Sequence, residues 1–180
     1  MQRFEAAPWP TSLKVVSLIG AALLVAVGIG AARAIPHGTR VPFAETFGTF
    51  VSFVPPAIAL FALLFVVRAY EVSPGELRVQ RLLWSTRLDL AGLRRAWHDP
   101  EAMCGSLRVF GNGGLFSFTG LYQNRALGRY RAFVTDPKRS VVLVLPARTL
   151  VLSPAEPRAF VEGLHAFFPR IESGPAPGHC

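Results

Sequence analysis

Two long stretches without a charged residue lie in the first 70 positions and constrain the fold more than any other feature. Residues 15–32 are 18 uncharged positions rich in Leu, Val, Ile, Ala and Gly, and residues 46–67 are 22 more. A helix needs about 20 apolar residues to cross the roughly 30 Å hydrocarbon core of a bilayer. We therefore predict transmembrane helices at about 13–34 and 46–68, which make residues 1–68 an N-terminal membrane anchor.

The flanks of these stretches favour a helical hairpin. Trp9 and Lys14 precede the first stretch, and Arg68 and Tyr70 follow the second, as interfacial anchors do. The short connection is rich in Pro and Gly, which predicts a turn between antiparallel helices. Basic residues are more frequent outside the hairpin than in the connection, so the positive-inside rule places both termini in the cytoplasm. Arginine predominates strongly over lysine, which is typical of GC-rich bacterial genomes, so we expect a bacterial inner membrane.

Two alternatives concern these helices. Ala32-Arg33-Ala34 resembles a signal-peptide cleavage site, but residues 15–32 are longer than the usual apolar region of a signal peptide. Pro55 and Pro56 interrupt the second stretch, where they either kink a spanning helix or break it into a re-entrant loop. A kinked helix is the favoured interpretation, because neighbouring helices can satisfy the freed backbone groups.

From residue 69 onward the hydrophobic pattern changes to alternation, which is typical of half-buried strands. Asp136-Pro137 predicts a turn, since the Asp side chain caps it and proline fixes φ. Strands are predicted at 69–73, 77–83, 86–90, 93–98, 129–135, 141–145 and 148–152.

An amphipathic helix is predicted to close this domain. Its apolar stripe consists of Phe160, Val161, Leu164, Phe167 and Phe168. The helix begins either after a capping box at 153–156 or with Pro157 as its first residue. Pro169 ends it, so the domain covers 69–169, and the Pro- and Gly-rich residues 170–180 are predicted to be a disordered tail.

Three motifs lie in order along this domain. Residues 108–120 are Arg-Val-Phe-Gly-Asn-Gly-Gly-Leu-Phe-Ser-Phe-Thr-Gly, residues 128–136 are Gly-Arg-Tyr-Arg-Ala-Phe-Val-Thr-Asp, and residues 152–160 are Leu-Ser-Pro-Ala-Glu-Pro-Arg-Ala-Phe. Together they resemble the signatures of bacterial pleckstrin-homology-like (PH-like) membrane proteins. The resemblance covers about 69–168. It implies a mainly-β domain of about seven antiparallel strands in a bent sheet or barrel, capped by a C-terminal helix, and it implies no established reaction.

The first two motifs and the residues between them supply the candidate contact residues. The glycines of the first motif lack the lysine that a phosphate-binding loop needs, so we interpret them as a structural loop with positive φ that lets the following aromatic residues pack or contact a partner. The structural loop comprises Gly111, Gly113, Gly114 and Gly120. Candidate contacts to a protein partner or an anionic lipid are Arg108, Phe116, Phe118, Arg125, Arg129 and Arg131.

No arrangement of residues points to catalysis, a metal or a cofactor. His98, Asp99 and Glu101 are close in sequence, but neighbours on a strand face opposite ways and Asp99-Pro100 predicts a turn. Cys104 and Cys180 form no metal-binding pattern, and we expect two free thiols.

These observations predict a membrane-anchored binding or scaffolding module with a protein or lipid partner. Nucleic-acid binding is disfavoured, because the domain is tethered and lacks an RNP-like motif. The alternative is a membrane enzyme or an accessory subunit of a transport or assembly complex. Association between copies through Gly20, Gly28 and Gly30 is a weaker hypothesis, since their spacing is not GxxxG.

Overall fold

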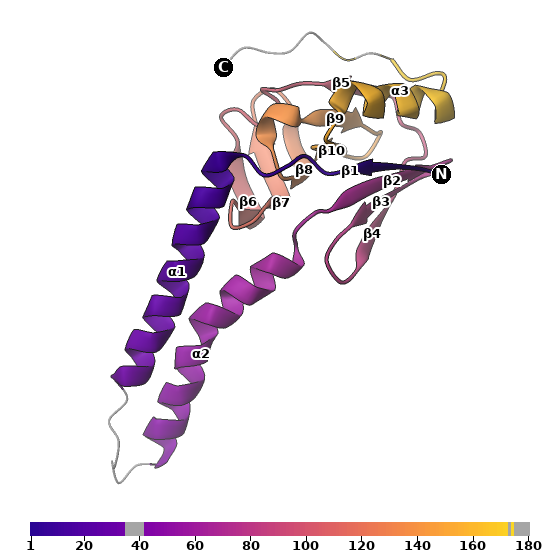
Figure 1. The fold of residues 1–180 in the computed structure, drawn as a ribbon. Coiled ribbons are helices and arrows are strands. Elements are labelled where there is room, and N and C mark those ends of the chain that lie inside the picture. The colour runs from indigo at the N-terminus through magenta and orange to yellow at the C-terminus, as the bar shows by residue number, and fades with distance from the viewer. Residues whose placement is uncertain (35–41, 173, 175–180) are drawn as a thin grey trace.

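The computed structural model describes residues 1–34, 42–172 and 174. Two long helices, α1 (Thr11–Arg33) and α2 (Pro42–Leu64), lie beside each other and extend away from a β-domain (Figure 1). Both are long and apolar enough to cross a membrane. Most of the connection between them, predicted as a turn, lies outside the described residues.

The α2 helix continues through Pro55 and Pro56 without ending. The C-terminal part of α2 leans away from α1 toward the β-domain (Figure 1). Gly28 marks a close approach of the two helices, since a Cβ there would lie 2.7 Å from the Ser52 carbonyl oxygen and 2.9 Å from Pro56 Cδ. A larger residue at position 28 would therefore push the helices apart.

The first sheet has four antiparallel strands in the order β1-β2-β3-β4. These are β1 (Gln2–Glu5), β2 (Ala69–Ser73), β3 (Glu76–Gln80) and β4 (Ser85–Asp89). Strand β1 precedes α1, so the residues before the first long helix belong to the domain rather than to the anchor assigned to 1–68. This strand was missed because its four residues contain one apolar side chain, and its partner lies on the far side of both helices in the sequence.

The second sheet has six strands in the order β5-β9-β10-β8-β7-β6. These are β5 (Arg95–His98), β6 (Leu107–Gly113), β7 (Phe118–Asn124), β8 (Gly128–Val134), β9 (Val141–Val144) and β10 (Thr149–Leu152). All neighbours are antiparallel except β8 and β10, which are parallel because the chain reverses direction twice between them, before and after β9. The described residues thus form ten strands where about seven were expected; β1, β6 and β7 are the additional ones.

Helix α3 (Pro157–Phe167) closes the domain (Figure 1). Phe160 and Leu164 of its predicted stripe are fully buried among side chains from both sheets. The helix begins at Pro157, and the alternative start at a capping box is wrong, because the Ser153 side chain makes its hydrogen bonds elsewhere.

The start of the predicted tail is ordered. The backbone nitrogen of Glu172 donates to the Arg94 carbonyl (2.9 Å), and Ile171 is buried in the main core. The disorder predicted for 170–180 is therefore wrong for 170–172, and 173 and 175–180 lie outside the described residues.

Strand β1 is held on α3 as well as on β2. The ring of Phe4 packs edge-on against Phe160, with centroids 4.9 Å apart. Gly163 leaves room for this contact, since a Cβ there would lie 2.7 Å from the Phe4 ring. The chain that leads into α1 is thereby fixed to the core of the domain.

We expect Phe4→Ala to lower the free energy of unfolding of the domain by about 2 kcal/mol, because a half-buried aromatic contact is lost. Arg3→Ala is the matched control, since the Arg3 side chain on the same strand is exposed and should change stability little. Thermal unfolding of the detergent-solubilised full chain measures both. Equal midpoints for the two variants would contradict a structural role for β1.

Candidate functional site

The predicted glycine loop is a β-hairpin formed by β6 and β7. Gly111 and Gly120 lie opposite each other with φ of +110° and +145°, and the register shifts between Arg108 and Phe110. A Cβ at Gly120 would collide with the Phe110 carbonyl oxygen, and a Cβ at Gly111 would collide with the opposite strand. The two strands approach more closely here than side chains allow, so this pair requires glycine.

The other two glycines have different surroundings. Gly114 lies in the turn with φ +112°. A Cβ at Gly113 would meet only the flexible Arg108 side chain. Of the four glycines assigned to a loop, Gly111 and Gly113 therefore lie in β6 and Gly120 in β7.

The turn of the β6–β7 hairpin docks on α1. The Ser17 hydroxyl donates to the Gly114 carbonyl (3.3 Å) and accepts from the Phe116 backbone nitrogen (2.8 Å). Phe116 is 9% exposed and its ring lies 5.9 Å from that of Trp9, which precedes α1. Phe116 thus packs inside the molecule.

The glycines proposed for association between copies make contacts within one copy. Gly20 faces Leu115 of the hairpin turn, with 3.2 Å from a Cβ to the Leu115 side chain, and Gly28 faces α2. Gly30 has open space around it. Association between copies stays a prediction.

A cavity of about 700 Å³ lies between the C-terminal half of α2 and strands β6 to β8; we name it the arginine groove. One wall is apolar and consists of Ile58, Phe61, Ala62 and Phe65. Three arginines, Arg81, Arg108 and Arg131, also line the groove, and Arg81 contacts Phe65 of the apolar wall. Phe110 and Leu121 complete its apolar surface. No acidic side chain lines the groove among the described residues.

Arg81 is the deepest of the three cations, at 6% exposed. It donates to the Phe65 carbonyl (2.8 Å) and to the Thr86 hydroxyl (3.3 Å). Its guanidinium also lies 5.5 Å from the centroid of the Phe133 ring, which Arg131 approaches at 5.0 Å. Burial, and next the positive charge of Arg131, lower the pKa of Arg81 to about 10, so Arg81 remains cationic at neutral pH.

These cations have no carboxylate partner in the described part of the chain. Arg108 donates to the Gly111 carbonyl (3.3 Å). The ion pairs among the described residues are Arg3–Glu5, Arg78–Glu76, Arg87–Glu76 and Arg139–Asp136, and none contains Arg81, Arg108 or Arg131. Three uncompensated positive charges beside an apolar wall favour an anionic, amphipathic ligand.

The structure brings together only part of the predicted contact set. Arg108 and Arg131 share the groove, whereas Arg125 and Arg129 lie at the β7–β8 turn, where Arg129 donates to Gln123 (3.4 Å). Phe118 packs against a second, smaller cluster of buried side chains that includes Tyr122 and Tyr130. Sequence reasoning missed Arg81 as a contact residue, because its position in the predicted strand 77–83 does not show that the fold brings it to Arg108 and Arg131.

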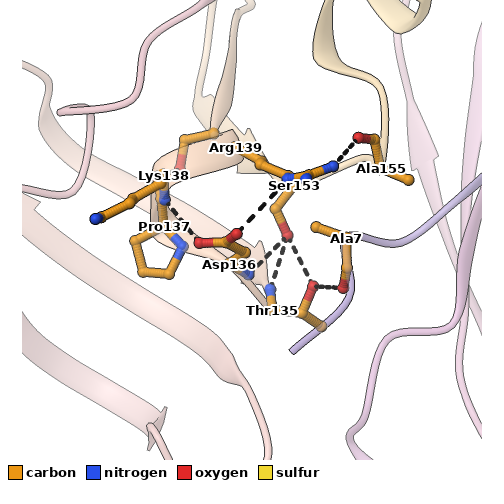
Figure 2. A network of polar contacts seen from close by, with 9 residues as sticks. Ala7, Thr135, Asp136, Pro137, Lys138, Arg139, Ser153 and Ala155 are labelled. Atoms are coloured by element: carbon orange, nitrogen blue, oxygen red, sulfur yellow. Dashed lines mark hydrogen bonds and ion pairs between the residues drawn. The ribbon is translucent and has the colours of Figure 1, made fainter. Parts of the chain in front are cut away.

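The polar residues Thr135, Asp136 and Ser153 of the second and third motifs have a structural role (Figure 2). The Ser153 hydroxyl accepts from the backbone nitrogen of Thr135 (2.7 Å), and the Thr135 hydroxyl donates to the Ala7 carbonyl (2.7 Å). Asp136 accepts from the Lys138 backbone nitrogen (3.0 Å), as predicted for a turn. The network joins the ends of β8 and β10 to the segment that leads into α1.

The residues considered for acid–base chemistry do not converge. Asp99 accepts from the Glu101 backbone nitrogen (2.9 Å) in the predicted turn. A smaller cavity of about 330 Å³ is lined by Glu101 but not by His98 or Asp99. No group of three or more potential metal ligands is found in the described part of the chain.

Cys104 is disulfide-bonded, which corrects the expectation of a free thiol. The other cysteine of the chain, Cys180, lies outside the described residues. Disulfides persist on the oxidising side of a bacterial membrane and are rare in the cytoplasm. This bond therefore opposes the cytoplasmic placement predicted from the basic residues.

Two β-sheets around one core, closed by a C-terminal helix, define a PH-like domain. A family model described as Bacterial PH domain matches residues 68–166, which is more than half of the chain. The chain belongs to the bacterial PH domain family, as the three motifs predicted. Comparison with curated proteins and with solved structures gave no match.

We expect Gly120→Ala to destabilise the domain by about 2 kcal/mol or more, because the added methyl collides with backbone at a positive φ. Gly113→Ala is the matched control in the same hairpin, where the side chain of Arg108 can move aside. Chemical unfolding of the full chain in detergent, followed by tryptophan fluorescence, compares the two. A stable Gly120→Ala variant would show that the close approach is not required.

Proposed function

We propose that this protein is a membrane-anchored binding or scaffolding module, without catalytic activity of its own, in the bacterial inner membrane. We place its PH-like domain at the cytoplasmic face on the positive-inside rule, against the indication of the disulfide at Cys104. There the domain is presented to a protein partner or to lipid headgroups. The observation that carries this proposal is a pair of apolar helices whose two ends both continue into the same β-sheet.

The exterior of the helix pair supports insertion in a bilayer. Large apolar side chains point outward along both helices, among them Leu18 at 72% exposed, Ile19, Phe50, Phe53 and Leu60. A continuous apolar surface of this extent is unfavourable in water and marks a membrane or protein contact. The adjoining β1 and β2 hold the domain directly at the end of the helices.

The outer strand β6 supports a binding role. It is an edge of the six-stranded sheet, and Leu107 (75%), Val109 and Phe110 (79%) are exposed on it. Unpaired edge strands and exposed apolar side chains are common docking surfaces for partner proteins.

Capture of partners tests the binding role. We expect chemical cross-linking of the full chain in its native membrane to recover a defined partner, and Val109→Asp to weaken that recovery several-fold by placing a charge on the β6 edge. Ala126→Asp, at an exposed position of the β7–β8 turn, is the control. Recovery of no partner, together with no preference for any lipid, would contradict a binding module.

Topology reporters test the anchoring. We expect a C-terminal fluorescent-protein fusion to fluoresce and an alkaline phosphatase fused between α1 and α2 to be active, because both termini lie in the cytoplasm. The chain should also resist extraction from membranes at alkaline pH. The reverse reporter pattern would place the domain outside, as the disulfide at Cys104 favours. Extraction at alkaline pH would contradict membrane insertion itself.

A further inference from the structure

We infer that the arginine groove binds one anionic phospholipid, with its phosphate at Arg81, Arg108 and Arg131 and the start of an acyl chain along α2. This inference rests on the proposed membrane anchoring, and it names the ligand class of the domain.

Charge is the first reason. Guanidinium groups donate paired hydrogen bonds to phosphate oxygens and are more easily desolvated than ammonium groups. Arg81 is held by the Phe65 carbonyl, so it offers its charge from a fixed position. Arg108 and Arg131 also line the groove and are exposed, so their side chains are accessible to a ligand. Bringing these cations together is unfavourable without an anion, and a phosphodiester supplies one.

The apolar wall is the second reason. Ile58, Phe61 and Ala62 belong to α2, and they lie next to the arginines rather than on a separate face. A soluble phosphate would use only the polar half of the groove. A phospholipid presents phosphate and hydrocarbon at adjacent positions, and a volume of about 700 Å³ accommodates a headgroup with the first part of a chain.

The third reason is the depth of the groove relative to the bilayer. The groove lies where α2 ends, which is the level at which a spanning helix leaves the hydrocarbon core. Trp84 packs on Phe65 with ring centroids 5.3 Å apart, and Leu82 and Leu83 beside it are exposed. Tryptophan is enriched at the headgroup level of membranes. The turn between β3 and β4 thus places the groove among lipid headgroups.

The region of β3 and β4 does not offer the same site. Arg78 and Arg87 on these strands both pair with Glu76, at 3.0 and 3.7 Å. These two arginines share the carboxylate of Glu76, whereas none of the ion pairs among the described residues contains an arginine of the groove.

The experiment is native mass spectrometry of the detergent-solubilised full chain, titrated with phosphatidylglycerol or phosphatidylcholine of the same chain length. We expect one phosphatidylglycerol to bind with at least tenfold preference. The double variant Arg108→Gln/Arg131→Gln should bind it roughly 25-fold more weakly, since each basic residue near an anionic lipid contributes about a fivefold factor. The control Arg125→Gln/Arg129→Gln carries the same change of charge outside the groove and should bind like the wild type.

A second pair of variants tests the apolar wall without touching a charge. Ala62→Trp fills the groove from α2 and should reduce phosphatidylglycerol binding at least fivefold. Leu60→Trp, on an exposed position of the same helix, should not. Glycerol phosphate and inorganic phosphate, added in large excess, should fail to displace the lipid.

These measurements can overturn the lipid site without overturning the proposed function. Equal binding of the two lipids, an unaffected Arg108→Gln/Arg131→Gln variant, or equal losses in the two arginine pairs would overturn the lipid site. Displacement by inorganic phosphate at the lipid's own concentration would also overturn it, in favour of a soluble anion site. In all these cases a membrane-inserted chain that recovers a protein partner would leave the proposed function standing.

Discussion

Strand β1 pairs with β2 although the entire α1–α2 hairpin lies between them in the chain. The pairing fixes the start of α1 and the end of α2 to neighbouring strands of one sheet. The network of Ala7, Thr135 and Ser153 extends the same attachment to the second sheet. Three features depend on this attachment. They are the direction of the two helices, the docking of the β6–β7 hairpin on α1, and the position of the arginine groove beside α2.

The arginine groove follows from this arrangement. Its lining comes from different parts of the chain: an apolar face of α2, strands β6 to β8, and the β3–β4 turn that carries Arg81. Buried arginine is ordinarily costly, but Arg81 recovers part of that cost through the Phe65 carbonyl and the aromatic rings around it. The other two arginines of the groove, Arg108 and Arg131, are exposed.

Periodicity predicted the features that depend on local pattern. The apolar runs, the strands at 69–73 and 141–145 and the stripe of α3 each repeat over enough residues to be recognised, and Asp136 was expected to cap a turn because its chemistry is local. β1 and the hairpin of β6 and β7 were not predicted as strands. Gln2–Glu5 has too few apolar residues to show alternation, and the close pairing of Gly111 with Gly120 looks like a loop in sequence. Arg81 could not be selected either, since only tertiary structure brings it to Arg108 and Arg131.

Because β1 precedes α1 in the chain, β1 and its partner β2 are synthesised at different times. The first strand leaves the ribosome long before its partner, which ends at Ser73, so it has no sheet to join while both apolar helices are being made. Contacts between such distant segments form late in folding. The first sheet can therefore be completed only after both long helices have been synthesised.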